Sequence, residues 1–173
     1  MATAIRGRAA MVYGGGHIRP HRHHWGQLIY AGSGVRRVKA GGTLSIVTPA
    51  RAVWVPAGAE HEIHGLGDFA MRTLYFPTGM TGALPDECRA LDVAPLLREL
   101  VLELVERCPI DDADGAAMRM TTVALDLIAQ AGVLALQLPR PLDMRARRLA
   151  ERLQAEPDSA AELPELARAA GAS

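Results

Sequence analysis

The first half of the chain alternates short apolar runs with glycine and proline. Five runs have the length and composition of strands: GQLIYA (26–31), VRRV (35–38), TLSIV (43–47), AVWV (52–55) and MRTLYF (71–76). Turns are predicted where Gly or Pro interrupts this pattern, at 40–42, 48–49 and 56–58. Leu44 and Ile46 alternate with Thr43 and Ser45, as in a strand with one apolar face. Strands at such close spacing predict a small antiparallel barrel or sandwich, and we expect no helix here.

After Pro85 the apolar residues recur at three- and four-residue steps, which predicts helices. The first helix is expected to have Asp92 as its cap and an external pair between Glu103 and Arg107. Its apolar positions are Leu96, Leu97, Leu100, Val101, Leu104 and Val105. A second helix, predicted from about Gly115 to Ala131, is apolar nearly all round and needs cover on both sides. That cover is either a second copy of the chain, which predicts a homodimer, or the barrel together with the preceding helix.

The last third of the chain predicts a linker and two short helices. The prolines of LPRPLD (138–143) indicate the linker, and a helix with arginines on a solvated face is expected over 144–156. A final helix is expected from about Glu162 or Leu163 to Ala170, because this start places Pro164 in the first turn. We therefore divide the chain into a barrel (1–85), a helical dimerisation region (86–137) and a linker helix followed by one further helix (138–173).

Composition excludes several classes of protein. The 173 residues suit one domain with appended structure, and 19 Lys and Arg balance 19 Asp and Glu. The chain as a whole therefore lacks the basic excess that is typical of proteins that bind nucleic acid or anionic membranes. No apolar run is long enough to cross a bilayer, and the first ten residues lack the apolar core of a secretion signal. We expect a cytoplasmic protein without a membrane partner, in which Cys88 and Cys108 are reduced.

The stretch HRHHWGQL (21–28) concentrates three of the six histidines. In a strand, residues two apart share a face, so His21, His23 and Gln27 are expected to point to the same side of the sheet. His61 can join them, because the turn at 56–58 can direct it inward. Three imidazoles and one amide oxygen suit one divalent ion such as zinc, nickel, iron or manganese. A hydrogen-bonded network of the same residues without an ion is the alternative.

These residues also carry a resemblance to the cupin family. The spacing Gly15-x5-His21-x-His23-x3-Gln27-x6-Gly34 resembles the first cupin motif, with glutamine where that motif usually has glutamate. The resemblance implies a small antiparallel barrel of the double-stranded β-helix or jelly-roll type, hence a mainly β fold with appended helices.

The spacing Pro56-x-Gly58-x2-His61 resembles the second cupin motif. Ala50 stands where that motif has a glycine, and Gly65 stands where it has an asparagine. The two motifs together imply that the histidines of both lie inside the same barrel.

The whole chain resembles the amino-terminal part of AraC/XylS-family transcriptional regulators. The resemblance lies in WGQLIYA, RAVWVPAGAEHEI, MRTLYFP and, at the end, LPELARAAGAS, which is similar to the first helix and turn of a helix-turn-helix unit. It implies a barrel that senses a small-molecule or metal effector, helices that form a homodimer, and a C-terminal domain, missing here, that binds operator DNA. We expect the hinge near Pro139 and Pro141, and little specific DNA affinity without the recognition helix.

Two further expectations concern the site. Trp54 and Tyr75 are candidates for the walls of an effector pocket if they line the same interior as the histidines. A metal-dependent cupin enzyme, similar to dioxygenases or isomerases, is the alternative function. Gln27 counts against it, because an amide in place of a carboxylate holds a hard divalent ion less tightly, and so does the helical tail.

Overall fold

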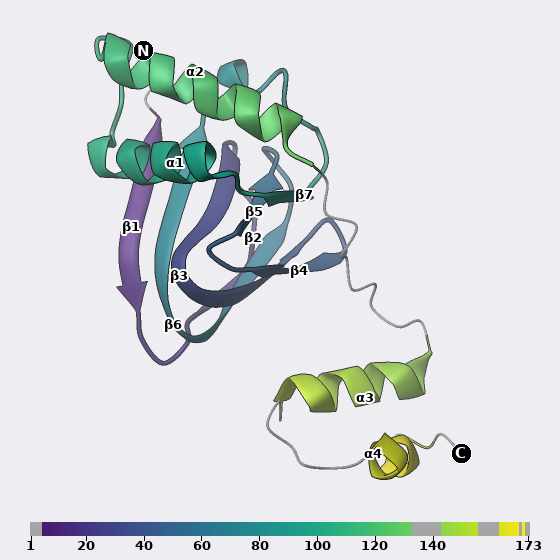
Figure 1. Cartoon of the computed structure of the whole chain (residues 1–173). Helices are drawn as coiled ribbons and strands as arrows, with labels where there is room; N and C mark the ends of the chain where they lie inside the picture. The colour runs from purple at the N-terminus through teal and green to yellow at the C-terminus, as the bar shows by residue number, and fades with distance from the viewer. Residues whose placement is uncertain (1–4, 133–142, 156–162, 170, 172–173) are drawn as a thin grey trace. The chain divides into compact units, whose positions relative to one another are not determined.

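The computed structural model describes residues 5–132, 143–155, 163–169 and 171. The chain divides into two compact units, Met1–Gln137 and Leu138–Ser173, which are considered separately below. Among the described residues, the first unit holds an antiparallel sheet and two long helices, and the second holds two shorter helices (Figure 1). The fold is mainly β with appended helices, as the sequence predicts.

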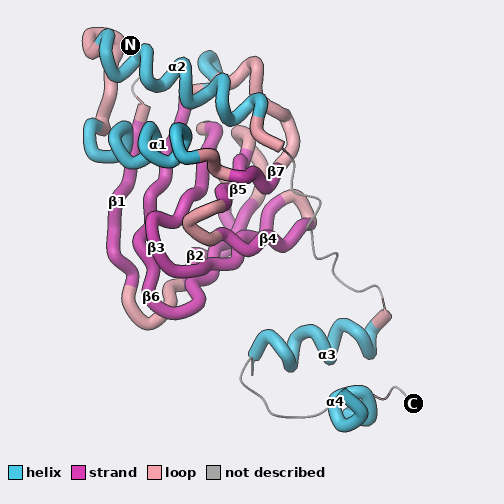
Figure 2. The backbone as a smooth tube through the Cα atoms, viewed as in Figure 1, coloured by secondary structure: helices cyan, strands magenta, loops and turns pink. Residues whose placement is uncertain are grey.

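Seven strands form one sheet in which every described pairing is antiparallel. They are β1 (Arg6–Val12), β2 (His17–His21), β3 (Gly26–Ala40), β4 (Thr43–Val47), β5 (Arg51–Val55), β6 (His61–Phe76) and β7 (Arg89–Asp92). The order is β1-β6-β3-β5-β7, with β2 also on β6 and β4 also on β3. The long strands β3 and β6 curve strongly, so that the sheet folds over on itself (Figure 2). Because β7 pairs with β5, the sheet continues past residue 85, where the sequence placed its end.

The two longest strands pass through glycines that sequence reasoning took as interruptions. GQLIYA and VRRV are two halves of β3, joined by a stretch with register shifts on either side of Ser33. Gly34 has a φ of +74°, a conformation that L-residues with a side chain rarely adopt. Glycine therefore makes a bulge that bends the strand without ending it. β6 passes in the same way through Gly65 and Gly67, whereas only 71–76 was predicted.

Alternation along the strands separates two apolar clusters. The inner cluster lies inside the curved sheet and consists of Ile29, Ala31, Val38, Ala40, Val47, Val53, Val55 and Ile63. The neighbouring positions on β3, β5 and β6 face the helices and include Leu28, Tyr30, Trp54, Leu74 and Phe76. In β4 the buried residues are Ser45 and Val47, so the face that carries Leu44 and Ile46 is the less buried one. The apolar alternation of TLSIV thus indicated a strand but not which face is inside.

Helix α1 (Pro95–Arg107) starts later than the sequence predicts. Its N-cap is Ala94, which makes no side-chain capping bond, and Pro95 takes the first helical position. The prediction of Asp92 as the cap is wrong, because Asp92 ends β7. The external pair is confirmed: Arg107 Nε donates to Glu103 Oε1 at 2.6 Å.

Helix α2 (Gly115–Gln130) packs on α1, which in turn contacts β1 and β6. The Asp114 side chain caps α2 by accepting a hydrogen bond from Ala117 N at 2.9 Å. The fully buried residues of α2 are small or β-branched, namely Ala117, Thr121, Ala124 and Ile128. The helix that lies between the sheet and another helix is therefore α1. The alternative that placed α2 between the barrel and the preceding helix is wrong. Both cysteines are free, as predicted.

The second unit contains α3 (Met144–Ala155) and α4 (Leu163–Ala169). Asp143 begins α3, because its carboxylate accepts hydrogen bonds from the backbone of Arg145 and Ala146 at 2.7 and 3.2 Å. The predicted start of the last helix is confirmed, with Pro164 in its first turn. The linker prolines Pro139 and Pro141 lie outside the described residues. Among the described residues, no helix combines the length and apolar character needed to cross a bilayer.

Candidate metal centre in the barrel

The four residues predicted to share a site lie together. His21 is the last residue of β2, His23 follows in the connection to β3, Gln27 is near the start of β3, and His61 is the first residue of β6. One ligand nitrogen from each of the three histidines lies within 4.8 Å of the others. The ring centres of His21 and His23 are 4.1 and 5.0 Å from that of His61. The three imidazoles are thus close enough for one small cation to contact all of them.

These residues converge for a different reason than the one predicted. His21, His23 and Gln27 do not lie on one strand, so strand alternation does not bring them together. Instead the pairing of β2 with β6 places His21 opposite His61. Gly58 N donates to the His23 carbonyl at 2.8 Å, which attaches the connection between β2 and β3 to the turn that precedes β6. Sheet pairing and this turn, rather than local alternation, build the cluster.

Each of the three imidazoles has its Nδ1 atom at a backbone carbonyl. The partners are Arg19 O for His21 at 2.9 Å, Trp25 O for His23 at 2.8 Å and Ala59 O for His61 at 3.1 Å. Because a carbonyl oxygen only accepts, each Nδ1 carries the proton and donates. In the neutral imidazole the other nitrogen, Nε2, then has a lone pair free to accept a hydrogen bond or bind a metal. This pattern of carbonyl partners is typical of histidines that bind metals.

Gln27 is buried and is held by a threonine that the sequence analysis missed. Its Oε1 atom lies 2.9 Å from His23 Nε2, and its Nε2 atom donates to Thr73 Oγ1 at 2.9 Å. The Thr73 hydroxyl donates in turn to the Leu28 carbonyl at 2.9 Å. Thr73 stands two residues before Tyr75 on β6, and this alternation could have indicated that it faces the same side. The chain of bonds orients the Gln27 amide oxygen toward the histidines.

His61 has the most unusual environment of the three. Its side chain is 1% exposed, and its Nε2 atom has no hydrogen-bond partner among the described residues. Burial, with smaller contributions from the neighbouring histidines, lowers the pKa of His61 to about 4. His61 is therefore neutral at pH 7, with a buried lone pair directed at the cluster.

The buried His61 predicts an acid-sensitive chain. Its ordinary pKa of 6.5 returns on unfolding, so between pH 6.5 and 4 the unfolded state takes up a proton that the folded state refuses. We expect this difference to lower the free energy of unfolding of the metal-free chain by about 2 to 3 kcal/mol between pH 7 and pH 4.5. Urea unfolding at both pH values, with chelator present, measures it. His61→Gln should lose this part of the pH dependence; an unchanged dependence would contradict the assignment.

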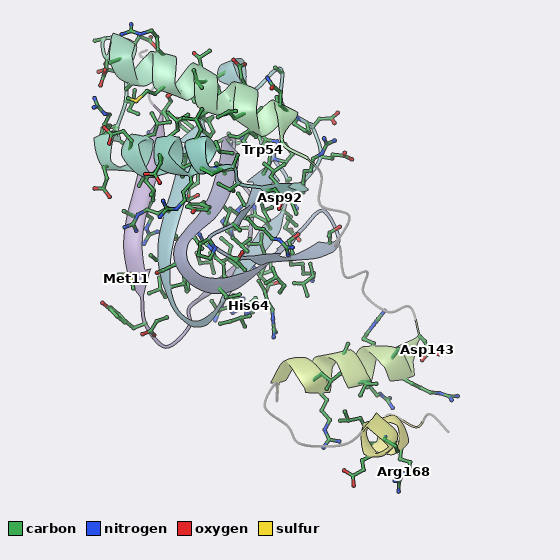
Figure 3. All side chains as sticks on the ribbon, in the orientation of Figure 1. Met11, Trp54, His64, Asp92, Asp143 and Arg168 are labelled. Atoms are coloured by element: carbon green, nitrogen blue, oxygen red, sulfur yellow. The ribbon has the colours of Figure 1, made fainter. Side chains whose placement is uncertain are left out.

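Tyr75 and Trp54 do not line the same space. The Tyr75 ring stands edge-on to His23 with centres 5.4 Å apart, so Tyr75 borders the histidine cluster. Trp54 instead faces the helices, and its Nε1 donates to Pro85 O at 2.8 Å. It lies at the helical end of the barrel in Figure 3. Tyr75 pairs with Gln27 and Trp54 pairs with the next residue, Leu28, so the two side chains face opposite sides of the sheet. The expectation that both residues line one pocket is wrong for Trp54.

A pocket of about 270 Å³ opens beside His61. It is lined by Pro20, Lys39, Ala40, Gly41, Gly42, Ala59, Glu60, His61 and Glu62. Ala40 and His61 are paired in the sheet and both are buried. The pocket thus reaches the edge of the histidine cluster.

A second histidine group lies on the outside of the same sheet. The Nε2 atoms of His17 and His64 lie 2.8 and 2.7 Å from one oxygen of Glu62, and the two rings stack with centres 3.9 Å apart. The hydrogen bonds from both histidines lower the pKa of Glu62. Here the imidazoles already have a carboxylate partner, in contrast to the inner cluster.

Comparison with known proteins agrees with this architecture. The family model described as AraC-like ligand binding domain matches residues 3–170. The HTH-type transcriptional regulator NimR of Escherichia coli is 31% identical over 138 residues, which are 79% of this chain and 50% of that protein. The chain thus spans about half the length of this relative.

Alignments with two solved structures differ in extent. Apo ToxT from Vibrio cholerae aligns with a TM-score of 0.56 over 99% of this chain and 72% of that chain, at 6% identity. A cupin superfamily protein from Desulfitobacterium hafniense aligns with a TM-score of 0.41 over 43% of this chain and 68% of that chain, at 18% identity. The family model covers nearly the whole sequence, the barrel and both sets of helices included. The chain therefore belongs to the AraC-like ligand-binding domain family.

Proposed function

We propose that this chain is the effector-sensing part of a DNA-binding transcriptional regulator. Membership of the AraC-like ligand-binding domain family carries this proposal. NimR, of which the chain spans half, is itself an HTH-type transcriptional regulator. Operator DNA would be bound by a C-terminal domain outside the present sequence. The barrel supplies what a sensor needs, namely polar groups that converge beside an apolar cluster in the interior.

We further propose that one divalent metal ion binds His21, His23, His61 and Gln27. The unpartnered Nε2 atom of His61 is the observation that supports it. With each Nδ1 protonated, the Nε2 lone pairs and the Gln27 amide oxygen are all acceptors, and a cation satisfies them together. Without an ion, turning the Gln27 amide by 180° would satisfy His23 alone. The metal-free network therefore leaves the Nε2 atom of His61 buried with no hydrogen-bond partner among the described residues.

The chemistry of the ligands restricts the ion. Imidazole nitrogen and amide oxygen suit zinc, nickel, iron or manganese. All four ligands are neutral, so the bound ion would keep its full double charge. Such an ion can be the effector itself, or it can bind an electron-rich group of a small-molecule effector.

A metal-dependent enzyme would use the same three histidines, and the sensor is the better-supported proposal. Gln27 replaces the carboxylate that would hold a hard ion tightly and offset its charge. The family that matches the chain is one of ligand-binding domains, and the relative with 31% identity is a regulator.

Signalling and dimerisation complete the proposal. An effector that binds one arrangement of barrel, helices and DNA-binding domain more tightly shifts the population toward it by its differential affinity. We propose a homodimer through α1 and α2, where Leu96 and Val123 are 56% and 43% exposed. Substitution of Val123 by arginine together with sedimentation analysis tests this interface.

Selection of bound sequences from a random DNA pool tests the proposed function. We expect the product of the complete gene to enrich one sequence family strongly, because a helix-turn-helix unit reads base edges in the major groove. The 173-residue chain should enrich none. Enrichment by this chain alone would overturn the proposed division of labour, and failure of the complete product to enrich any sequence would overturn the regulatory function.

A further inference from the structure

One charged side chain in the barrel has no hydrogen-bond partner among the described residues. Arg36 is 0% exposed, and its three guanidinium nitrogens are buried without a hydrogen bond. Burial lowers the pKa of this guanidinium to about 10, so it stays charged at neutral pH. A charge out of water with no counter-charge is strongly unfavourable. The environment of Arg36 is therefore incomplete without an added group.

Arg36 lies on the interior face of the sheet. It pairs with Val47 of β4 and with Gly65 of β6. Val47 and Val38, which is two residues after Arg36, belong to the inner apolar cluster, and strand alternation gives Arg36 the same face. The side chain thus reaches into the space inside the curved sheet.

The aromatic ring of Phe69 forms one wall beside the guanidinium. The Arg36 Cζ atom lies 5.3 Å from the centre of this ring, within the range of a cation–π contact. A Cβ atom at Gly65 would collide with the ring, so the missing side chain there leaves room for Phe69 next to Arg36. The ring covers one face of the guanidinium, but it accepts no hydrogen bond from the N–H groups along the guanidinium edge.

The carboxylates that flank this site on β6 are engaged elsewhere. Glu62 accepts hydrogen bonds from His17 and His64 on the outer face, and Asp68 Oδ1 accepts one from Gly14 N at 2.8 Å. Neither is paired with Arg36. The counter-charge has to come from outside the described residues.

We propose that Arg36 binds the carboxylate of a small organic acid inside the barrel. This names the chemical class of the effector and rests on the sensing function proposed above. A guanidinium presents two parallel N–H donors that match the two oxygens of one carboxylate. One buried positive charge balances one negative charge, which favours a monocarboxylate over a phosphate dianion. The apolar neighbours Val38, Val47 and Ile63 suit the hydrocarbon part of such an acid.

Thermal unfolding of the purified 173-residue chain with very small acids tests the proposal. The probes are formate, acetate and propionate, compared with formamide, acetamide and propionamide at constant ionic strength set by sodium chloride. Each acid should raise Tm by about 3 to 6 °C when its concentration reaches ten times its Kd. The neutral amides should have no effect, because they bring no charge.

Variants assign the response to Arg36. Arg36→Met should fold with a Tm at or above that of the parent, since it removes a buried charge, and should lose the response to acids. Arg36→Lys should respond more weakly, because lysine lacks the paired donors. Arg37→Met, at the next residue and on the opposite face, is the matched control and should respond fully.

Three results would overturn the proposal: no response to any acid, an equal response to chloride and formate, or an equal response in the parent and in Arg36→Met. The first would mean that water satisfies Arg36. None of these results depends on DNA binding, so failure here leaves the DNA selection as a separate test of the regulatory function.

Discussion

Replacement of His61 by alanine is expected to lower the zinc affinity of this chain by at least about 100-fold. Loss of a residue that only supports a metal ligand typically lowers the metal affinity about 10- to 100-fold. Removal of a ligand itself should lower the affinity by at least the upper end of that range. Among the proposed ligands, His61 is also the one whose Nε2 atom has no hydrogen-bond partner among the described residues. Competition of the purified protein with a chromophoric zinc chelator measures the change directly.

Matched variants separate ligation from general damage to the fold. His24 is exposed and lies outside the cluster, so His24→Ala should leave the zinc affinity unchanged. Thr73→Val keeps the shape of its side chain but removes the hydroxyl that orients Gln27, and should weaken zinc binding by about 10-fold. Gln27→Glu should strengthen it, because a carboxylate adds a negative charge. Equal zinc affinity of the parent and His61→Ala, or no zinc binding by the parent, would disprove the metal centre.

Replacement of Gly34 by alanine is expected to reduce the free energy of unfolding by about 2 to 5 kcal/mol. A residue with a side chain at the φ of +74° costs about 1 to 2 kcal/mol. The added Cβ would also collide with the Asp68 carbonyl and lie 2.7 Å from Phe69 Cβ, and such overpacking adds about 1 to 3 kcal/mol. Relief would require the backbone of β6 to move, and Phe69 is buried against Arg36. Urea unfolding of both proteins measures the difference.

Gly42 provides the control for this effect. Its φ of +78° is nearly the same, but a Cβ atom there would have no neighbour within 4 Å. Gly42→Ala should therefore cost only the backbone part, about 1 to 2 kcal/mol. If both variants lose the same stability, the close contact between the bulge of β3 and β6 is not what holds the two long strands together.

Particular residues show where the sequence was informative about the site. The spacing of His21, His23, Gln27 and His61 predicted their convergence, and the structure confirms it. Strand alternation, however, was the wrong reason, because the first three residues lie on two strands and the connection between them. Thr73 and Arg36 were missed, because a threonine or an arginine in a strand is as often outside as inside, and the side it takes depends on register.

The fold was predictable where signals are local. Glycine and proline punctuation, three- to four-residue apolar spacing and the position of Pro164 depend on backbone sterics and on neighbours within one turn, and the helices and most of the central strands follow from them. β1 and β2 escaped prediction, because these edge strands bury too few residues to show alternation. The continuity of β3 and β6 escaped prediction as well. A glycine at positive φ can either end a strand or bend it, and the sequence does not distinguish the two cases.

The sequence by itself therefore determined the class of the protein: a β-rich, glycine-punctuated half with clustered histidines, followed by amphipathic helices. Only the tertiary structure decided that Trp54 faces the helices while Tyr75 faces the histidines, and that Arg36 is buried with no hydrogen-bonded counter-charge in the part of the chain that the structure describes. The physical reason is that the face of a strand residue, and so its solvation and partners, is set by pairing with strands distant in the chain. A shift of one residue in that pairing would reverse every one of these assignments.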